Sequence, residues 1–146
     1  MTGAGPPPAV LLDTCAVLWL ANEKLLDPTA VNAIRHAGAA SGVFISPVSA
    51  WEIGLLSRKP PVAGATVFLP DPKTWFARVM SGPGIKPAVY TYGIAIDAAH
   101  LPGDFHRDPG DRLLIATARH LAIPIVTRDR LILAYAEQGH VRAIAC

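Results

Sequence analysis

The chain has 146 residues, of which 51% are hydrophobic, and a formal net charge of only +2. One domain of this length can bury a hydrophobic core without disulfides, and the two cysteines exclude a disulfide framework or a zinc site of ordinary spacing. Because the net field is weak, any binding of nucleic acid must depend on a local cluster of basic residues.

Neither a membrane span nor a signal peptide is expected in the N-terminal part of the chain. The longest apolar run, 9–21, contains Asp13 and falls short of the ~20 residues that a bilayer requires. The Gly/Pro-rich segment before it has no basic residue, unlike a secretory leader. We therefore expect a cytoplasmic protein with a flexible N-terminal tail over 1–8 and one domain over 9–146. The mean hydropathy of +0.35 indicates apolar surface for a partner.

The first predicted elements are a strand and two helices. The apolar run 9–12 predicts a buried strand, and Thr14 can cap a helix that extends to about Asn22. Cys15 lies in this apolar segment and is expected to be a small core residue. A second helix begins at Asp27-Pro28, where proline occupies the first helical position.

The middle of the chain is predicted to contain two strands and three helices. A strand is expected at 43–45 and a helix at 49–58. After a loop around Pro60-Pro61, a helix is expected at 71–80, and 81–87 reads as a Gly/Pro loop. A strand at 89–92 then leads into a short helix that ends near Ala99. The side chains of the 49–58 helix expected to face inward are Trp51, Leu55 and Leu56.

The last third completes an alternation of strands and helices. It contains a helix at 108–121, a strand at 124–126, a helix at 129–137 and an edge strand at 141–144. The alternation predicts an α/β fold, with a mostly parallel central sheet of about five strands and helices on both faces. The three tryptophans are expected to anchor the core or an interface, and the apolar region 60–100 is expected to include a dimer or partner surface.

Acidic residues follow three of the predicted strands. Asp13 follows the first strand, Glu52 lies one turn into the helix after the second, and Asp129 closely follows the 124–126 strand. Because ligands bind at the carboxyl ends of parallel strands, these side chains are expected to meet at one edge of the sheet. Asp108 and Asp111 open a helix three residues apart and share a face.

Each acid can also be explained by a purely structural role. Asp108 and Asp129 are good N-cap residues, Asp111 can favour the helix dipole, and Glu52 can be a solvated helix residue. Asp13 is the hardest to explain in this way, because an acid in an apolar strand–helix unit is costly unless its charge is compensated. The evidence for a functional site is therefore the arrangement of the five acids together, and not any one of them.

Such a cluster points to a hard divalent cation. Carboxylates held close together repel and take up protons unless a cation is present, and Mg²⁺ and Mn²⁺ prefer oxygen ligands. A bound cation of this kind can activate water and neutralise charge on a phosphate. The five histidines are scattered along the sequence, and only His106 lies close enough to the acids to be tested as a site residue.

Four segments resemble, in order, the motifs of PIN-domain ribonucleases. They are Leu11-Leu12-Asp13-Thr14, the segment 46–53 (Ser-Pro-Val-Ser-Ala-Trp-Glu-Ile), the segment 106–116 (His-Arg-Asp-Pro-Gly-Asp-Arg-Leu-Leu-Ile-Ala) and Val126-Thr127-Arg128-Asp129. The closest resemblance is to the VapC toxins of bacterial and archaeal toxin–antitoxin pairs. It extends from about Val10 to the C-terminus and assigns a single PIN domain to 9–146.

The resemblance implies roles for individual residues. The family's four catalytic acids correspond to Asp13, Glu52, Asp111 and Asp129, and Asp108 matches an extra acid of this subgroup. Metal ligation is implied for Asp13, Asp111 and Asp129, with Glu52 and Asp108 as further candidates; Glu52 alternatively orients the attacking water. Two positions depart from the common pattern: Cys15 stands in place of a histidine and Gly110 in place of an aromatic residue.

Other residues near the acids are candidates for supporting roles. Ser49 and Thr127 either hydrogen-bond the carboxylates or serve only as polar residues at helix termini. Arg107, Arg112 and Arg128 either contact the RNA backbone, which would make binding sensitive to salt, or belong to a solvated face.

The implied function is a VapC-like endoribonuclease toxin that uses Mg²⁺ or Mn²⁺. It is expected to form a homodimer, to be neutralised by a cognate VapB-type antitoxin, and to have no membrane partner. Its expected substrate is a structured RNA with an exposed loop, such as tRNA or rRNA. The alternatives are a PIN nuclease of RNA maturation or DNA processing, and a PIN-like binding module without catalysis. The intact set of acids argues against the last alternative.

Overall fold

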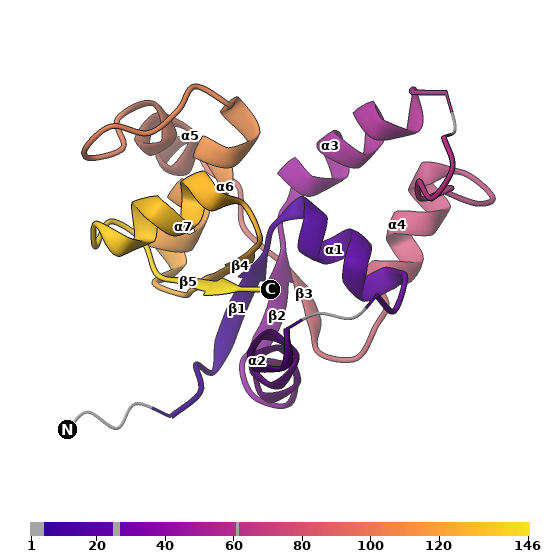
Figure 1. The fold of residues 1–146 in the computed structure, drawn as a ribbon, viewed down its shortest axis with the longest axis horizontal. Coiled ribbons are helices and arrows are strands. Elements are labelled where there is room, and N and C mark those ends of the chain that lie inside the picture. Colours follow the sequence, from indigo (N-terminus) through magenta and orange to yellow (C-terminus); the bar gives the residue numbers. More distant parts are fainter. Residues whose placement is uncertain (1–4, 25–26, 61) are drawn as a thin grey trace.

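Five parallel strands form a central sheet in the spatial order β3-β2-β1-β4-β5 (Figure 1). The computed structural model describes residues 5–24, 27–60 and 62–146. Residues 1–4 of the expected N-terminal tail and Pro61 of the predicted loop lie outside the described residues. The strands are β1 (Ala9–Leu12), β2 (Gly42–Ile45), β3 (Ile85–Pro87), β4 (Ile125–Thr127) and β5 (Ala143–Ala145).

Helices cover both faces of this sheet, as the sequence predicts. They are α1 (Thr14–Ala21), α2 (Pro28–Ala39), α3 (Pro47–Ser57), α4 (Pro72–Met80), α5 (Tyr92–Ala99), α6 (Pro109–Leu121) and α7 (Arg130–Glu137). Four of them begin with proline after an Asp or Ser whose side chain accepts a backbone N–H of the first turn, which is a strong local start signal. None of the described helices is long and apolar enough to span a membrane.

The side chains of the central strands alternate between two hydrophobic clusters. Leu11 and Ile125 enter the cluster that α5, α6 and α7 cover, whereas Val10, Leu12 and Val126 enter the cluster that α1, α2 and α4 cover. This alternation follows from the two-residue period of a strand. It explains why every residue of β1 is buried and why the strand reads as an unbroken apolar run.

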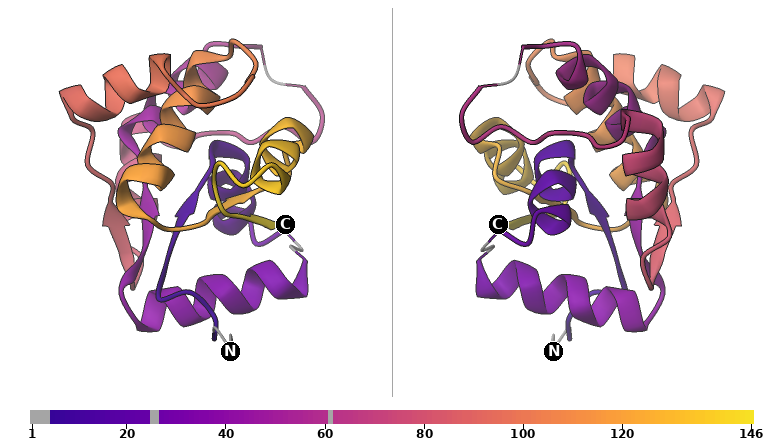
Figure 2. Two further views of the ribbon diagram at one scale, coloured as in Figure 1. Left: turned by 90° about the vertical axis from the view of Figure 1, so that its left-hand side faces the viewer. Right: turned by 90° about the vertical axis from the view of Figure 1, so that its right-hand side faces the viewer.

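The carboxyl end of β1 leads directly into the region where the candidate acids are expected. Figure 2 shows α2 at one end of the molecule, with α3 and α5 at the other. The helix α3 packs against both α1 and α6, and it contributes Val48 to one hydrophobic cluster and Ile53 to the other. It therefore bridges the two helical layers above the end of the sheet.

The inward face predicted for α3 is wrong. Trp51 is 53% exposed, Leu55 41% and Leu56 36%. Val48, Ser49 and Ile53 face inward instead. Because apolar residues lie all around this helix, its sequence has no polar stripe that identifies the solvent side. The helix also begins earlier than predicted, since Ser46 caps it by accepting the Val48 N–H at 3.0 Å.

The strand predicted at 89–92 is also wrong. The third strand is β3, which lies in the segment predicted as a Gly/Pro loop and pairs with β2. Tyr92 instead begins α5, because Thr91 accepts the Ile94 N–H and caps that helix. A proline at the end of an edge strand removes no interior ladder bond, so Pro87 is compatible with β3.

Candidate active site

Asp13 joins the first strand to the first helix and contacts the fourth strand. Its Oδ1 accepts the Ala16 N–H at 2.8 Å, so Asp13 rather than the predicted Thr14 caps α1. Its Oδ2 accepts the Thr127 hydroxyl at 2.5 Å. Burial raises the pKa of the Asp13 carboxyl, and the negative charges of Asp129 and Glu52 raise it further. Two hydrogen bonds therefore fix the orientation of the Asp13 carboxyl, and its charged form is disfavoured in the fold.

Glu52 reaches the same region from α3. Its Oε1 accepts the Thr14 hydroxyl at 2.5 Å, and the Thr14 oxygen lies 3.0 Å from Ser49 Oγ. Ser49 is thus placed to hold Thr14 rather than to contact a carboxylate directly. The sequence does not predict that Thr14 holds Glu52, because the partners of the Thr14 hydroxyl are 35 and 38 residues away along the chain.

The space next to Gly110 is taken by carboxylates. A Cβ at this position would lie 2.7 Å from Glu52 Oε2 and 3.3 Å from Asp108 Oδ1. The glycine therefore allows Glu52 to approach the N-terminus of α6. Burial, and then the charge of Asp108, raise the pKa of the Glu52 carboxyl.

Asp111 is the electrostatic centre of the cluster. Burial and the negative charges of four other acids raise its pKa to about 7. Those acids, in decreasing order of effect, are Asp108, Asp129, Glu52 and Asp13. The four other predicted acids are therefore all close enough to act on Asp111, although three of them come from distant parts of the chain.

Asp108 and Asp129 both cap helices while they belong to this cluster. Asp108 Oδ1 accepts the Asp111 N–H at 3.1 Å, and Asp129 Oδ1 accepts the Leu131 N–H at 2.8 Å. The Thr127 hydroxyl accepts the Asp129 N–H at 3.0 Å while it donates to Asp13. Thr127 therefore links the Asp13 carboxylate to the backbone of Asp129.

The three arginines predicted to contact RNA have different environments. Arg112 directs its guanidinium to the backbone carbonyls of Ala98, Phe105, His106 and Ala99, so the prediction that it contacts RNA is corrected to a structural role. Arg128 lies over the Trp19 ring at 3.4 Å and donates to the Cys146 carbonyl at 2.9 Å. Arg107 is exposed. Cys15, expected in the core, is also exposed, in the first turn of α1.

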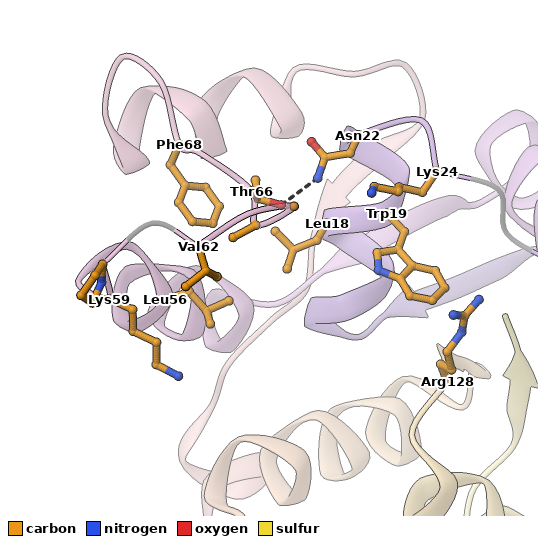
Figure 3. Close-up of a pocket in the computed structure, with 13 residues that line it drawn as sticks. Leu18, Trp19, Asn22, Lys24, Leu56, Lys59, Val62, Thr66, Phe68 and Arg128 are labelled. Carbon is orange, nitrogen blue, oxygen red and sulfur yellow. Dashed lines mark hydrogen bonds between the residues drawn. The ribbon is translucent and has the colours of Figure 1, made fainter.

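An apolar groove begins beside the site at the Trp19–Arg128 pair (Figure 3). It has a volume of about 790 Å³ and lies between α1, α3 and the segment 62–68. Its apolar lining includes Leu18, Leu56, Val62 and Phe68. Among the described residues that line it, Lys24, Lys59 and Arg128 carry the only charges. A bond from Asn22 Nδ2 to Thr66 Oγ1, at 2.8 Å, ties α1 to the segment opposite.

The two other tryptophans, Trp75 and Trp51, differ in burial. Trp75 packs edge-on against Phe68 with ring centroids 4.9 Å apart, at the margin of a core cluster. Trp51 is 53% exposed, so the core alternative is wrong for this residue, and an interface role stays a prediction.

Comparison with known proteins identifies relatives that cover almost the whole chain. The model of the PIN domain family matches residues 10–138. Ribonuclease VapC22 of Mycobacterium tuberculosis is 30% identical over 122 residues, which cover 83% of this chain and 87% of the relative.

Solved structures share the fold at lower sequence identity. VapBC2 from Rickettsia felis, bound to a DNA fragment from its promoter, has a TM-score of 0.67 and 11% identity, covering 94% of this chain and 98% of that one. DNA-bound VapBC from Salmonella typhimurium has a TM-score of 0.60 and 13% identity, with 94% and 97% coverage. VapBC-5 from Mycobacterium tuberculosis, from a family of toxin–antitoxin systems, has a TM-score of 0.56 and 19% identity, with 96% and 100% coverage.

Proposed function

Since this chain belongs to the PIN-domain family, we propose that it is a metal-dependent endoribonuclease toxin of the VapC type, neutralised by a VapB-type antitoxin. The observation that carries the proposal is the convergence of Asp13, Glu52, Asp111 and Asp129 from four separate parts of the chain, which the bonds of Thr14 and Thr127, the contact of Glu52 with Gly110 and the proximity of Asp111 to Asp129 show. The similarity to Ribonuclease VapC22 supports ribonuclease activity, and the order of the VapC-like motifs supports the antitoxin partner.

The donor set fits a hard divalent cation, Mg²⁺ or Mn²⁺. All the acids offer carboxylate oxygens, which such cations prefer. The raised pKa values of Asp13, Glu52 and Asp111 indicate negative charge that the protein alone does not compensate. We assign Asp13, Asp111 and Asp129 as ligands, directly or through water. Asp108 is a further candidate, since it lies close enough to raise the pKa of Asp111.

The chain's own residues then have distinct tasks in cleavage. A bound divalent cation lowers the pKa of water and neutralises charge on the phosphate undergoing displacement. Glu52 is placed to orient the attacking water, since Thr14 holds one of its oxygens and the other is directed toward Gly110. Thr127 fixes the orientation of Asp13, so that the carboxylate needs no rearrangement when the substrate binds.

The proposed substrate is a structured RNA with an exposed single-stranded loop, such as tRNA or rRNA. Sequence-specific RNA recognition favours such loops because their bases are accessible. Arg107 and Arg128 remain candidates for contact with the phosphate backbone. We also propose a homodimer, for which the exposed apolar side chains Tyr92 and Ile96 of α5 offer an interface.

Expression of the chain in growing cells is the experiment that tests this function. Induction should arrest growth and produce new RNA 5′ ends, which RNA-end sequencing locates at one or a few sites. Co-expression of the antitoxin from the neighbouring reading frame should prevent both effects. Cleavage confined to precursor RNA, without growth arrest, would instead favour a nuclease of RNA maturation, and an absence of cleavage by the purified protein would favour a binding module.

We expect an antitoxin segment with apolar and acidic side chains to occupy the groove of Figure 3. Its apolar lining and its three cations complement such a segment. Val62→Glu should weaken antitoxin binding by about tenfold or more, equivalent to ~1.4 kcal/mol, because it places an acid in the apolar lining. Isothermal titration calorimetry with purified antitoxin measures the effect.

Val67→Glu is the matched control for the groove variant. Val67 is exposed in the same segment but does not line the groove. RNA cleavage should be unchanged in both variants, since neither residue belongs to the acidic site. Equal antitoxin affinity in the two variants would place the antitoxin elsewhere.

A further inference from the structure

The imidazole of His106 faces the acidic site from the segment that precedes α6. Its Nε2 lies 3.1 Å from Asp111 Oδ2. The Nε2 atom is buried, and it has no well-aligned hydrogen bond among the described residues. The sequence alone left the role of His106 open, and none of the functions proposed above uses it.

The backbone determines which nitrogen of His106 carries the hydrogen. The Asp108 N–H donates to His106 Nδ1 at 3.3 Å, so Nδ1 accepts and carries no hydrogen. In a neutral imidazole the hydrogen then resides on Nε2, the atom that faces Asp111. A protonated nitrogen has no lone pair for a metal ion.

This tautomer separates two possible roles for His106. Ligand atoms of His106, Asp111 and Asp129 lie within 4.8 Å of one another, a spacing that a single metal ion could span. However, direct ligation through Nε2 would require its hydrogen to move to Nδ1, which would break the bond from the Asp108 N–H. Donation to Asp111 Oδ2, 3.1 Å away, keeps the tautomer that this bond fixes. The geometry therefore favours a donor over a ligand.

We propose that His106 is a positioning residue that donates its Nε2–H to the Asp111 carboxylate and thereby orients this carboxylate for the divalent cation. The inference rests on the proposed metal-dependent function. Carboxylates that bind metal ions are commonly oriented by such outer partners, whose removal weakens metal binding.

Arg112 and Phe105 hold His106 in place. The Arg112 guanidinium donates to the carbonyls of Phe105 at 3.1 Å and His106 at 3.3 Å. The Phe105 ring packs on the imidazole with ring centroids 4.2 Å apart, and it also packs on Tyr135. Since Asp111 and Arg112 are adjacent in α6, the same helix turn carries the carboxylate and fixes the residue that orients it.

Calorimetric titration of the purified chain with Mn²⁺ tests this inference without measuring activity. We expect His106→Ala to weaken Mn²⁺ binding by about 10- to 100-fold. His106→Gln should recover most of the affinity, because its amide N–H can still donate to Asp111. His120→Ala is the control, since His120 is an exposed histidine in the last turn of α6, far along the helix from Asp111, and this variant should bind Mn²⁺ like the unmodified chain.

Four results would overturn the inference. Normal Mn²⁺ affinity in His106→Ala would show that Asp111 needs no orienting partner, and equal weakening in His106→Gln would assign His106 a packing role. A nitrogen coupling in the pulsed EPR spectrum of bound Mn²⁺ that disappears in His106→Gln would show direct ligation. If the unmodified chain itself binds no Mn²⁺ or Mg²⁺, the proposed metal-dependent function fails, and this inference fails with it.

Discussion

Asp13→Asn is expected to abolish RNA cleavage and to leave the fold intact. The substitution removes one negative charge from the site but retains an oxygen that can accept the Ala16 N–H and cap α1. The Thr127 hydroxyl can accept from the new amide instead of donating. Loss of a proposed metal ligand should reduce the cleavage rate by more than the ~100-fold upper value for outer partners. A labelled RNA substrate and circular dichroism measure the two effects.

The same variant should be more stable than the unmodified chain when no metal is bound. Burial raises the pKa of the Asp13 carboxyl because its charged form is disfavoured in the fold, and Asn removes that charge. We expect a higher Tm in EDTA and a smaller increase in Tm on addition of Mg²⁺. Asp27→Asn is the matched control, since Asp27 caps α2 in the same way but is exposed. Full cleavage by Asp13→Asn would refute the assigned site.

Chelation of divalent cations should stop cleavage, and the stability of the metal-free chain should depend on pH. The pKa of Asp111 is about 7 in the fold, raised by burial and neighbouring acids, whereas the unfolded chain loses this proton near its ordinary value of 3.8. Between these values the folded chain holds a proton that the unfolded chain lacks. The free energy of unfolding should therefore decrease as pH rises from about 4 to about 7 and change little above that.

Thermal unfolding between pH 5 and pH 8 measures this dependence. In EDTA the Tm should be higher at pH 5, and saturating Mg²⁺ should raise the Tm most at pH 8, where the carboxylates are free of protons. Asp111→Asn should make the Tm in EDTA less dependent on pH.

Chelation is tested on cleavage itself. Addition of Mg²⁺ or Mn²⁺ in excess over EDTA should restore RNA cleavage. Metal-independent cleavage, or a Tm in EDTA that increases with pH over this range, would contradict the proposed role of the acids.

The sequence by itself determined the alternation of strands and helices and the position of the acids along the chain. The apolar runs of β1, β2 and β4 and the Asp-Pro starts of α2, α4 and α6 are local signals, which act within a few residues. With the rule that parallel strands place ligands at their carboxyl ends, they were sufficient to predict that Asp13, Glu52 and Asp129 lie at one edge of the sheet. The resemblance to the PIN family added Asp111, which the structure places within reach of Asp129.

Only the tertiary structure decided which side chains touch. The edge strand β3 depends on pairing with β2, and the inward face of α3 depends on the helices packed around it. Likewise, Thr14 meets Glu52 across 38 residues, and the Arg112 guanidinium donates to carbonyls of Ala98 in α5 and of Phe105 in the segment before α6. Local propensity cannot encode these contacts, because their energy arises only when elements distant in sequence pack against one another.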